Sequence, residues 1–208
     1  MKSARLIQES IQTICDTQGK CSVMLTGGRS AERLYAELRN LPKFKTLKSV
    51  TFYFGDERCV PPADSASNYG MAMRALFALG VPSGCLVFRM DADEVDRERA
   101  TLCYEGILPD KIDIMLLGVG EDGHIASLFP HSAALHETLR RVVPVAGPKP
   151  PFQRLTITPR VIQNAGEVFV LALGEQKYAV YEEALRDPAD IDGFPARLVL
   201  NRTWIFGE

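Results

Sequence analysis

The segment IDIMLLG (112–118) is the clearest strand candidate in the chain, and a glycine-rich stretch, GVGEDGH (118–124), follows it directly. Its apolar character is nearly continuous rather than alternating. This pattern is typical of a strand that is covered on both faces, as in a parallel sheet. The glycines then predict that the chain leaves the sheet at residue 118.

Similar short apolar runs lie on both sides of this segment. They are CSVML (21–25), VTFYF (50–54), RLTIT (154–158) and VFVLALG (168–174). Helical patterns occur between these runs, and alternation of strand and helix favours an α/β protein. We therefore predict a mainly parallel open sheet with helices on both faces, which is a Rossmann-like three-layer sandwich.

Helices are expected where apolar residues recur every three or four positions. This spacing occurs over residues 3–18, from Ser30 onward, after Ser67 and within residues 92–108. The segment PVAGPKPP (144–151) is rich in Pro and Gly, and we interpret it as a loop. No repeat or linker divides the sequence, so residues 1–208 are expected to form a single domain.

Composition narrows the class of protein. The chain has 208 residues, 46% of them hydrophobic, and its 24 basic and 26 acidic residues give a net charge of −2. The apolar content is too high for a disordered chain. A pI near 6.0 argues against nucleic acid or an anionic membrane as the main partner.

The five cysteines indicate a reducing compartment. Their number is odd and no CxxC pair occurs, which favours reduced, mostly buried thiols over a disulfide framework or a zinc site. The first 16 residues carry Glu9 and Asp16 among the apolar residues, unlike a signal peptide. The expected location is therefore the cytoplasm.

Ligands of open parallel sheets bind beyond the carboxyl ends of the strands. The first such end is LTGGRSAERLY (25–35). Gly27 and Gly28 allow the backbone to approach a ligand closely, and the amides at a helix start favour an anion. Arg29 adds positive charge and Ser30 adds a hydroxyl group. The alternative is an ordinary turn with Ser30 as the helix cap.

The second strand end is FGDERCVPP (54–62). Asp56, Glu57 and Arg58 follow an aromatic strand, and charged groups are costly to bury unless they are paired. These side chains are candidates for contact with a polar ligand. The alternative is a surface loop with an ion pair.

The third strand end, LLGVGEDGHIASLFP (116–130), contains His124 after a run of glycines. A histidine there suits general-base chemistry near neutral pH, although it could also fill a helix start. Gly118, Gly120 and Gly123 match a dinucleotide fingerprint. That motif requires a following helix, which Pro130 would interrupt early.

Two further sets of residues are of the types that bind a metal ion or an anionic substrate. His124, His131 and His136 match no common metal-ligand spacing. Lys149, Arg154 and Lys177 are cations near strand ends, which suits an anionic substrate or a solvated surface. No G-x-S-x-G elbow or P-loop occurs in the chain, which removes the usual serine-hydrolase and NTPase interpretations.

Together these segments resemble the 6-phosphogluconolactonase family, which shares a superfamily with glucosamine-6-phosphate deaminases. The matching motifs are TGGRS (26–30), DERCVPPADSASNYGMA (56–72), GVGEDGHIASLFP (118–130) and the stretch from Pro150 to Thr156. The chain departs from the family pattern at Ala31, where proline is common. The sequence Asp56-Glu57-Arg58, in place of the deaminases' DEY, favours the lactonases. So does the continuation Ser127-Leu128-Phe129-Pro130.

The resemblance implies hydrolysis of 6-phospho-D-glucono-1,5-lactone in the oxidative pentose phosphate pathway. His124 would activate water, with Asp56 or Asp122 orienting it and Arg58 or backbone amides stabilising the oxyanion. The turn of Gly27, Gly28, Arg29 and Ser30 would hold the phosphate together with Arg154 and Lys177. No metal or organic cofactor is implied, and a monomer or weak homodimer is expected. A deaminase or isomerase, and a non-catalytic sugar-phosphate sensor, remain as alternatives.

Overall fold

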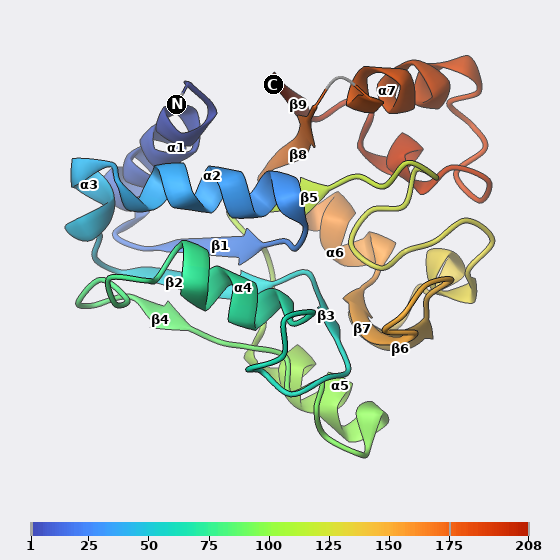
Figure 1. Cartoon of the computed structure of the whole chain (residues 1–208), viewed down its shortest axis with the longest axis horizontal. Helices are drawn as coiled ribbons and strands as arrows, with labels where there is room; N and C mark the ends of the chain where they lie inside the picture. The colour runs from blue at the N-terminus through green and yellow to red at the C-terminus, as the bar shows by residue number, and fades with distance from the viewer. Residues whose placement is uncertain (1, 175, 208) are drawn as a thin grey trace.

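A computed structural model describes residues 2–174 and 176–207, and it centres on a six-stranded sheet (Figure 1). The strand order is β4-β2-β1-β5-β8-β9, and every pair of neighbours is parallel. The strands are β1 Cys21–Leu25, β2 Val50–Phe54, β4 Leu86–Val87, β5 Ile114–Gly118, β8 Glu167–Leu173 and β9 Thr203–Gly207. The predicted mainly parallel α/β fold is therefore confirmed.

The central strand β5 separates two apolar cores. Ile114 and Leu116 pack with α1 and α2, whereas Met115 and Leu117 pack with α5 and α7. These four side chains are at most 1% exposed, which explains why the segment is apolar throughout. Helices therefore cover both faces of the sheet, as predicted for a three-layer sandwich.

The predicted helical segments all contain helices. The helices are α1 Lys2–Gln18, α2 Arg29–Arg39, α3 Pro42–Lys45, α4 Asn68–Ala75, α5 Arg97–Ile107, α6 Pro159–Asn164 and α7 Gln176–Arg186, and the 3₁₀ segments are η1 Ala133–His136 and η2 Pro195–Val199. Ser67 caps α4 by accepting a hydrogen bond from the backbone nitrogen of Gly70 at 2.9 Å. Within the two described ranges, no helix is long and apolar enough to cross a membrane.

A second, smaller sheet corrects part of the prediction. Its order is β3-β7-β6, with β3 at Asp56–Arg58, β7 at Gln153–Ile157 and β6 at Val142–Ala146, and both pairs are antiparallel. RLTIT (154–158) therefore belongs mostly to an antiparallel strand rather than to the parallel sheet. Likewise, 144–146 of the expected loop lie in β6. A five-residue apolar run indicates burial but does not reveal which partner it pairs with.

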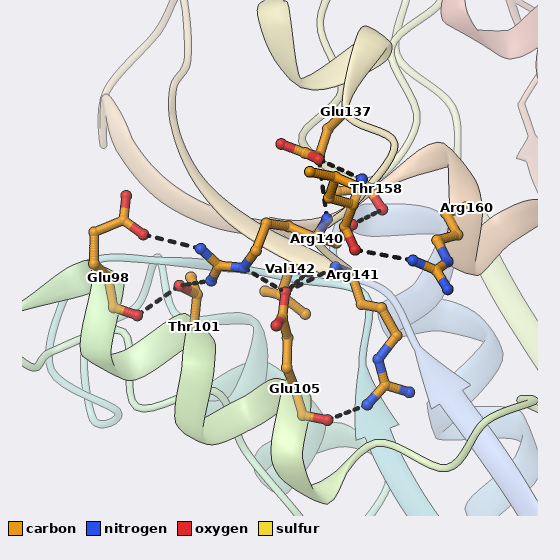
Figure 2. Close-up of polar contacts among 10 residues, drawn as sticks. Glu98, Thr101, Glu105, Glu137, Arg140, Arg141, Val142, Thr158 and Arg160 are labelled. Carbon is orange, nitrogen blue, oxygen red and sulfur yellow. Dashed lines mark hydrogen bonds and ion pairs between the residues drawn. The ribbon is translucent and has the colours of Figure 1, made fainter.

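Helix α5 anchors the start of β6 through Glu105 (Figure 2). One carboxylate oxygen of Glu105 accepts hydrogen bonds from the backbone nitrogens of Arg141 and Val142, at 2.7 and 2.8 Å. The same oxygen accepts from Arg140 Nε at 3.0 Å. Because Arg140 also donates to Thr101 Oγ1 at 2.9 Å, the small sheet has a fixed position relative to α5.

The expectation of mostly buried thiols holds for only part of the chain. All five cysteines are free; Cys21 and Cys85 are buried, Cys15 and Cys59 are half-buried, and Cys103 is exposed. Cys15 lies near both Cys21 and Cys85, and burial is the largest cause that raises the pKa of each of these three thiols.

Candidate active site

A pocket of about 580 Å³ opens beyond the carboxyl ends of β1, β5 and β8. This is the position expected for a ligand site in an open parallel sheet. Nine of the ten predicted site residues line it: Gly27, Gly28, Arg29, Ser30, Asp56, Arg58, His124, Arg154 and Lys177. The tenth, Asp122, contacts His124. Five chain segments that are far apart in the sequence thus meet around one cavity.

The turn after β1 presents the start of α2 to the pocket. Gly28 is the N-cap residue, with a φ of 93° that glycine adopts without strain. Ser30 lies inside the helix and donates to the carbonyl of Leu173 at 3.4 Å, so it is not the cap that the alternative interpretation required. The hydroxyl of Tyr35 holds the backbone of Thr26 through two hydrogen bonds of 2.9 Å. These two hydrogen bonds fix the backbone where the turn begins.

Asn68 lies directly over Gly27, and sequence reasoning did not select it as a site residue. A Cβ atom on Gly27 would lie 2.0 Å from Asn68 Oδ1, so only glycine fits there. Asn68 Nδ2 donates to the carbonyl and the carboxylate of Asp56, at 2.9 and 3.1 Å. Asn68 Oδ1 is buried and has no hydrogen-bond partner among the described residues. Asn68 is one of the residues that line the pocket.

The acidic residues of the DER segment are buried, and neither forms an ion pair with a described residue. Glu57 is 3% exposed and accepts from the backbone nitrogens of Arg58, Asn68 and Tyr69 at 2.7, 2.7 and 2.8 Å. Burial raises its pKa, and these hydrogen bonds oppose that rise. Glu57 therefore supports the site from behind, and the surface ion-pair interpretation is wrong.

Arg58 and Arg154 form a pair of like charges. They are direct partners across the antiparallel β3–β7 pair, and Arg154 is only 8% exposed. Burial, and then the charge of Arg58, lower the pKa of Arg154. Arg58 Nε is buried and has no hydrogen-bond partner in the described chain. Like charges placed opposite each other are destabilising, so this arrangement favours an anion between them.

Packing holds Arg154 in place. Its guanidinium lies 5.4 Å from the ring centroid of Phe129, and its Nε donates to the carbonyl of Pro151 at 3.1 Å. Lys149, the third predicted cation, is exposed and is not among the lining residues. It contributes its carbonyl, which accepts from Arg154 Nη2 at 3.4 Å.

His124 pairs with Asp122 rather than with Asp56. Its Nδ1 lies 2.5 Å from Asp122 Oδ1. This hydrogen bond is the main cause that lowers the pKa of Asp122 to about 2. Asp56 instead accepts from Ser127 Oγ at 2.6 Å. With Nδ1 committed to a carboxylate, Nε2 is the ring nitrogen that remains for chemistry.

A second group of cations lies at the starts of α2 and α7. Lys177 Nζ donates to the carbonyl of Val119 at 2.8 Å. Burial is the first cause that lowers the pKa of Lys177, and the charge of Arg29 lowers it further. Arg33 also lines the pocket, and it too was missed. Its position one helical turn after Arg29 places it on the same helix face, which is a signal that the sequence contained.

The other two histidines share one partner, Asp192, which is not among the lining residues of the pocket. His131 Nδ1 and His136 Nε2 lie 2.8 and 2.9 Å from the two carboxylate oxygens of Asp192. Among residues 2–174 and 176–207, no group of three or more His, Cys, Asp or Glu is placed to hold a metal ion.

The segment after β5 does not form the helix of a dinucleotide site, because β5 leads through a loop and the 3₁₀ segment η1 to β6. Gly118, Gly120 and Gly123 therefore lack the following helix that a dinucleotide fingerprint requires.

The chain is similar to known proteins along most of its length. The chain is 35% identical over 205 residues to the 6-phosphogluconolactonase of Mycobacterium tuberculosis, covering 90% of this chain and 83% of that protein. It is 36% identical over 199 residues to 6-phosphogluconolactonase 3 of Saccharomyces cerevisiae, covering 89% and 78% of the two chains.

Solved structures are similar along nearly the whole chain. The 6-phosphogluconolactonase of Trypanosoma brucei matches with a TM-score of 0.85 at 30% identity, covering 99% of this chain and 90% of that one. The enzyme from Shewanella baltica matches with a TM-score of 0.86 at 26% identity, covering 100% and 92%. The sequence profile of one family matches residues 1–206. The chain belongs to this family, described as glucosamine-6-phosphate isomerases/6-phosphogluconolactonase.

Proposed function

We propose that the chain hydrolyses 6-phospho-D-glucono-1,5-lactone to 6-phosphogluconate. The observation that carries this proposal is the His124–Asp122 pair, with a Nδ1–Oδ1 distance of 2.5 Å, beside a pocket that contains two groups of cations. The substrate has an uncharged, reactive lactone at one end and a phosphate at the other. The pocket offers a base for the first group and positive charge for the second. The relatives named above are hydrolases of this kind.

In this proposal His124 is the general base. Nδ1 donates its hydrogen to Asp122, so the Nε2 lone pair takes a proton from water as the oxygen attacks C1 of the lactone. The bond between C1 and the ring oxygen then breaks, and the imidazolium returns its proton to that ring oxygen. Asp122 stabilises the imidazolium that forms between the two steps.

Arg58 and Arg154 are assigned to the lactone end. As the water attacks, the carbonyl oxygen of C1 gains negative charge, and preorganised donors lower the energy of that state. The family resemblance implied that Arg154 would bind the phosphate. Its position opposite Arg58 now supports a role at the oxyanion and at the product carboxylate.

The phosphate end is assigned to the turn of Gly27, Gly28, Arg29 and Ser30 together with Lys177. The start of α2 supplies backbone amides, which suit a phosphate dianion, and Lys177 lies close enough to Arg29 for the two charges to interact. Binding the phosphate orients the lactone for attack. Arg33, on the same helix, adds charge at this end.

The first experiment measures lactone opening in an assay coupled to 6-phosphogluconate dehydrogenase, with the spontaneous rate subtracted. The proposal expects acceleration well above that rate. If lactone opening is not accelerated but glucosamine 6-phosphate releases ammonia, the deaminase alternative is correct. Binding of 6-phosphogluconate without either reaction would identify a sensor.

The second experiment replaces His124 with alanine. Loss of a positioned general base is expected to lower kcat by ~10²–10⁴-fold, while the affinity for 6-phosphogluconate stays within a few-fold. His136→Ala is the matched control, because His136 contacts Asp192 outside the pocket. An unchanged kcat in His124→Ala would remove this residue from the mechanism.

A further inference from the structure

The segment that follows α7, residues 187–199, lies beside the loop that carries His124 (Figure 1). We propose that Phe194 in this segment is a positioning residue for His124. It acts through the backbone of Gly123 and is held in place by Arg197. The inference rests on the proposed function, because His124 is the general base there. Among the described residues that line the pocket, neither Phe194 nor Arg197 occurs.

Phe194 lies directly against Gly123. The φ of Gly123 is +78°, and a Cβ atom at this residue would lie 2.6 Å from three carbons of the Phe194 ring. In addition, the backbone nitrogen of Ala196 donates to the carbonyl of Gly123 at 2.7 Å. Gly123 separates Asp122 from His124 in the sequence, so both contacts act on the backbone that joins the acid to the base.

Arg197 holds Phe194 from the other side. Its guanidinium lies 5.2 Å from the centroid of the Phe194 ring, and its side chain is 5% exposed. It donates to the carbonyl and the carboxylate of Asp190, at 2.7 and 2.9 Å, and to the carbonyl of Ala184 in α7 at 3.4 Å. The same Asp190 carboxylate accepts from the backbone nitrogen of Gly193 at 2.8 Å. The Phe194 ring therefore packs against a guanidinium that is itself held by hydrogen bonds.

Helix α7 restrains the opposite end of the same loop. Lys177 in its first turn donates to the carbonyl of Val119 at 2.8 Å, while Arg197 connects its last turn to Phe194. Helix α7 and the segment that follows it therefore contact both ends of the loop at residues 119–123. Gly120 lies in this loop, and a Cβ atom there would lie 2.0 Å from His124 Nδ1. The imidazole therefore packs against the restrained backbone.

A glycine in this conformation needs external restraint, because it loses more conformational freedom on folding than any other residue. Removal of the Phe194 ring would leave a cavity beside it and allow Gly123 to move. The 2.5 Å contact between Asp122 and His124 depends on that backbone. Small displacements of catalytic groups, near 1 Å, can lower rates by ~10²-fold.

The kinetic experiment compares three variants. Phe194→Leu is expected to lower kcat by ~10–100-fold, with KM within three-fold of the wild type. Phe194→Tyr keeps the ring and is expected to retain kcat within three-fold. Phe77→Leu is the matched control, because Phe77 is 3% exposed and lies in the core on the other face of the sheet. Its ring centroid is 5.1 Å from that of Phe52. This variant is expected to lose stability but keep kcat.

A second readout does not depend on activity. The chain has three histidines, so the imidazole nitrogen signals of His124 can be assigned by comparison with His124→Ala in NMR spectra. The proposal expects Phe194→Leu to shift these signals, and Phe77→Leu to leave them unchanged. This result holds even if the wild type opens no lactone, so the two proposals fail separately.

The inference is overturned if folded Phe194→Leu keeps both kcat and the His124 signals, or if Phe77→Leu lowers kcat equally. Should Phe194→Leu fail to fold, Arg197→Lys provides the test. It leaves the ring in place but removes the stacked guanidinium, and is expected to lower kcat three- to ten-fold. An Arg197→Lys enzyme with wild-type kcat and unchanged His124 signals would also contradict the proposal.

Discussion

The two ends of the pocket carry positive charge in different ways. At one end Arg58 and Arg154 face each other across antiparallel strands, and Arg154 is 8% exposed. At the other end Arg29 and Lys177 lie in the first turns of two helices, α2 and α7, and Arg29 is exposed. The first pair is fixed in a sheet, whereas the second combines the exposed Arg29 and the half-buried Lys177 with backbone amides at a helix start.

This difference matches the two tasks of the proposed reaction. Charge that develops on a single carbonyl oxygen is best stabilised by donors that need no rearrangement. A phosphate dianion already carries its charge and accepts several hydrogen bonds from amides at a helix start. The buried pair therefore suits the transition state, and the helix starts suit ground-state binding. This assignment predicts that the ends affect different kinetic constants.

Among the cations of the two ends, the largest effect is expected from Arg154→Gln. Loss of one oxyanion donor typically lowers kcat by ~10²–10³-fold, and KM should change little because the phosphate contacts remain. Steady-state kinetics measure both constants. Arg160→Gln is the control, because Arg160 lies outside the pocket and donates to the carbonyl of Leu139. If Arg154→Gln raises KM and leaves kcat intact, Arg154 belongs to the phosphate end and the comparison fails.

Lys177→Met should act mainly on binding. A hydrogen bond to a charged group contributes about 1.5–3 kcal/mol, which corresponds to a rise in KM of roughly 10–150-fold. The methionine keeps the apolar stem but removes the ammonium group. Because Lys177 also donates to Val119, a fall in kcat of up to three-fold is expected as well. A larger fall in kcat, without a change in KM, would assign Lys177 to the lactone end.

The sequence predicted the helix-start end better than the sheet end. TGGRS follows an apolar strand, and the rule for open parallel sheets locates such turns at the ligand. The family resemblance instead grouped Arg154 with Lys177 at the phosphate. Antiparallel pairing of β7 with β3 brings Arg154 opposite Arg58. Long-range register of this kind is set by tertiary contacts that no local pattern encodes.

The same limit applies to the residues that support the site. His124 and the glycines around it form a local motif, so they were found. Asn68 faces Gly27 only after the helix start of α4 is brought to β1, and Phe194 meets Gly123 from 71 positions later in the chain. Asn68 lies within the quoted motif at 56–72, but the motif gave it no role, and Phe194 lies outside the quoted motifs. Residues that act through packing need the fold before their role can be seen.

A matched pair of ligands separates the two ends without any chemistry. 6-Phosphogluconate and glucitol 6-phosphate differ at C1, where the first has a carboxylate and the second a hydroxymethyl group. Charge-assisted hydrogen bonds from the arginine pair should favour 6-phosphogluconate by about 10-fold in Kd. Calorimetry should show this preference shrinking below three-fold in Arg154→Gln and persisting in Lys177→Met. If Arg154→Gln weakens the binding of both ligands by the same factor, the assignment is contradicted.

The smallest expected effect is on the free energy of unfolding. It concerns Asp122, which lies beside His124 at the lactone end. The pKa of Asp122 is lowered to about 2, chiefly by its hydrogen bond with His124. A carboxylate with a depressed pKa stabilises the fold above its unfolded-state pKa of ~3.9, and this contribution is lost as the pH falls toward 2. The side chain is 44% exposed, so solvent screening reduces the contribution to under about 1 kcal/mol.

Asp122→Asn should therefore be slightly less stable than the wild type at pH 5, and the difference should shrink by pH 3. Urea unfolding at the two pH values measures it. The exposed residue Glu182 in α7 supplies the control variant Glu182→Gln, for which the difference from the wild type should not depend on pH in this way. A gap for Asp122→Asn that widens on acidification would mean that the carboxylate is not held by the imidazole. The lactone end would then lack the orienting group that distinguishes it from the phosphate end.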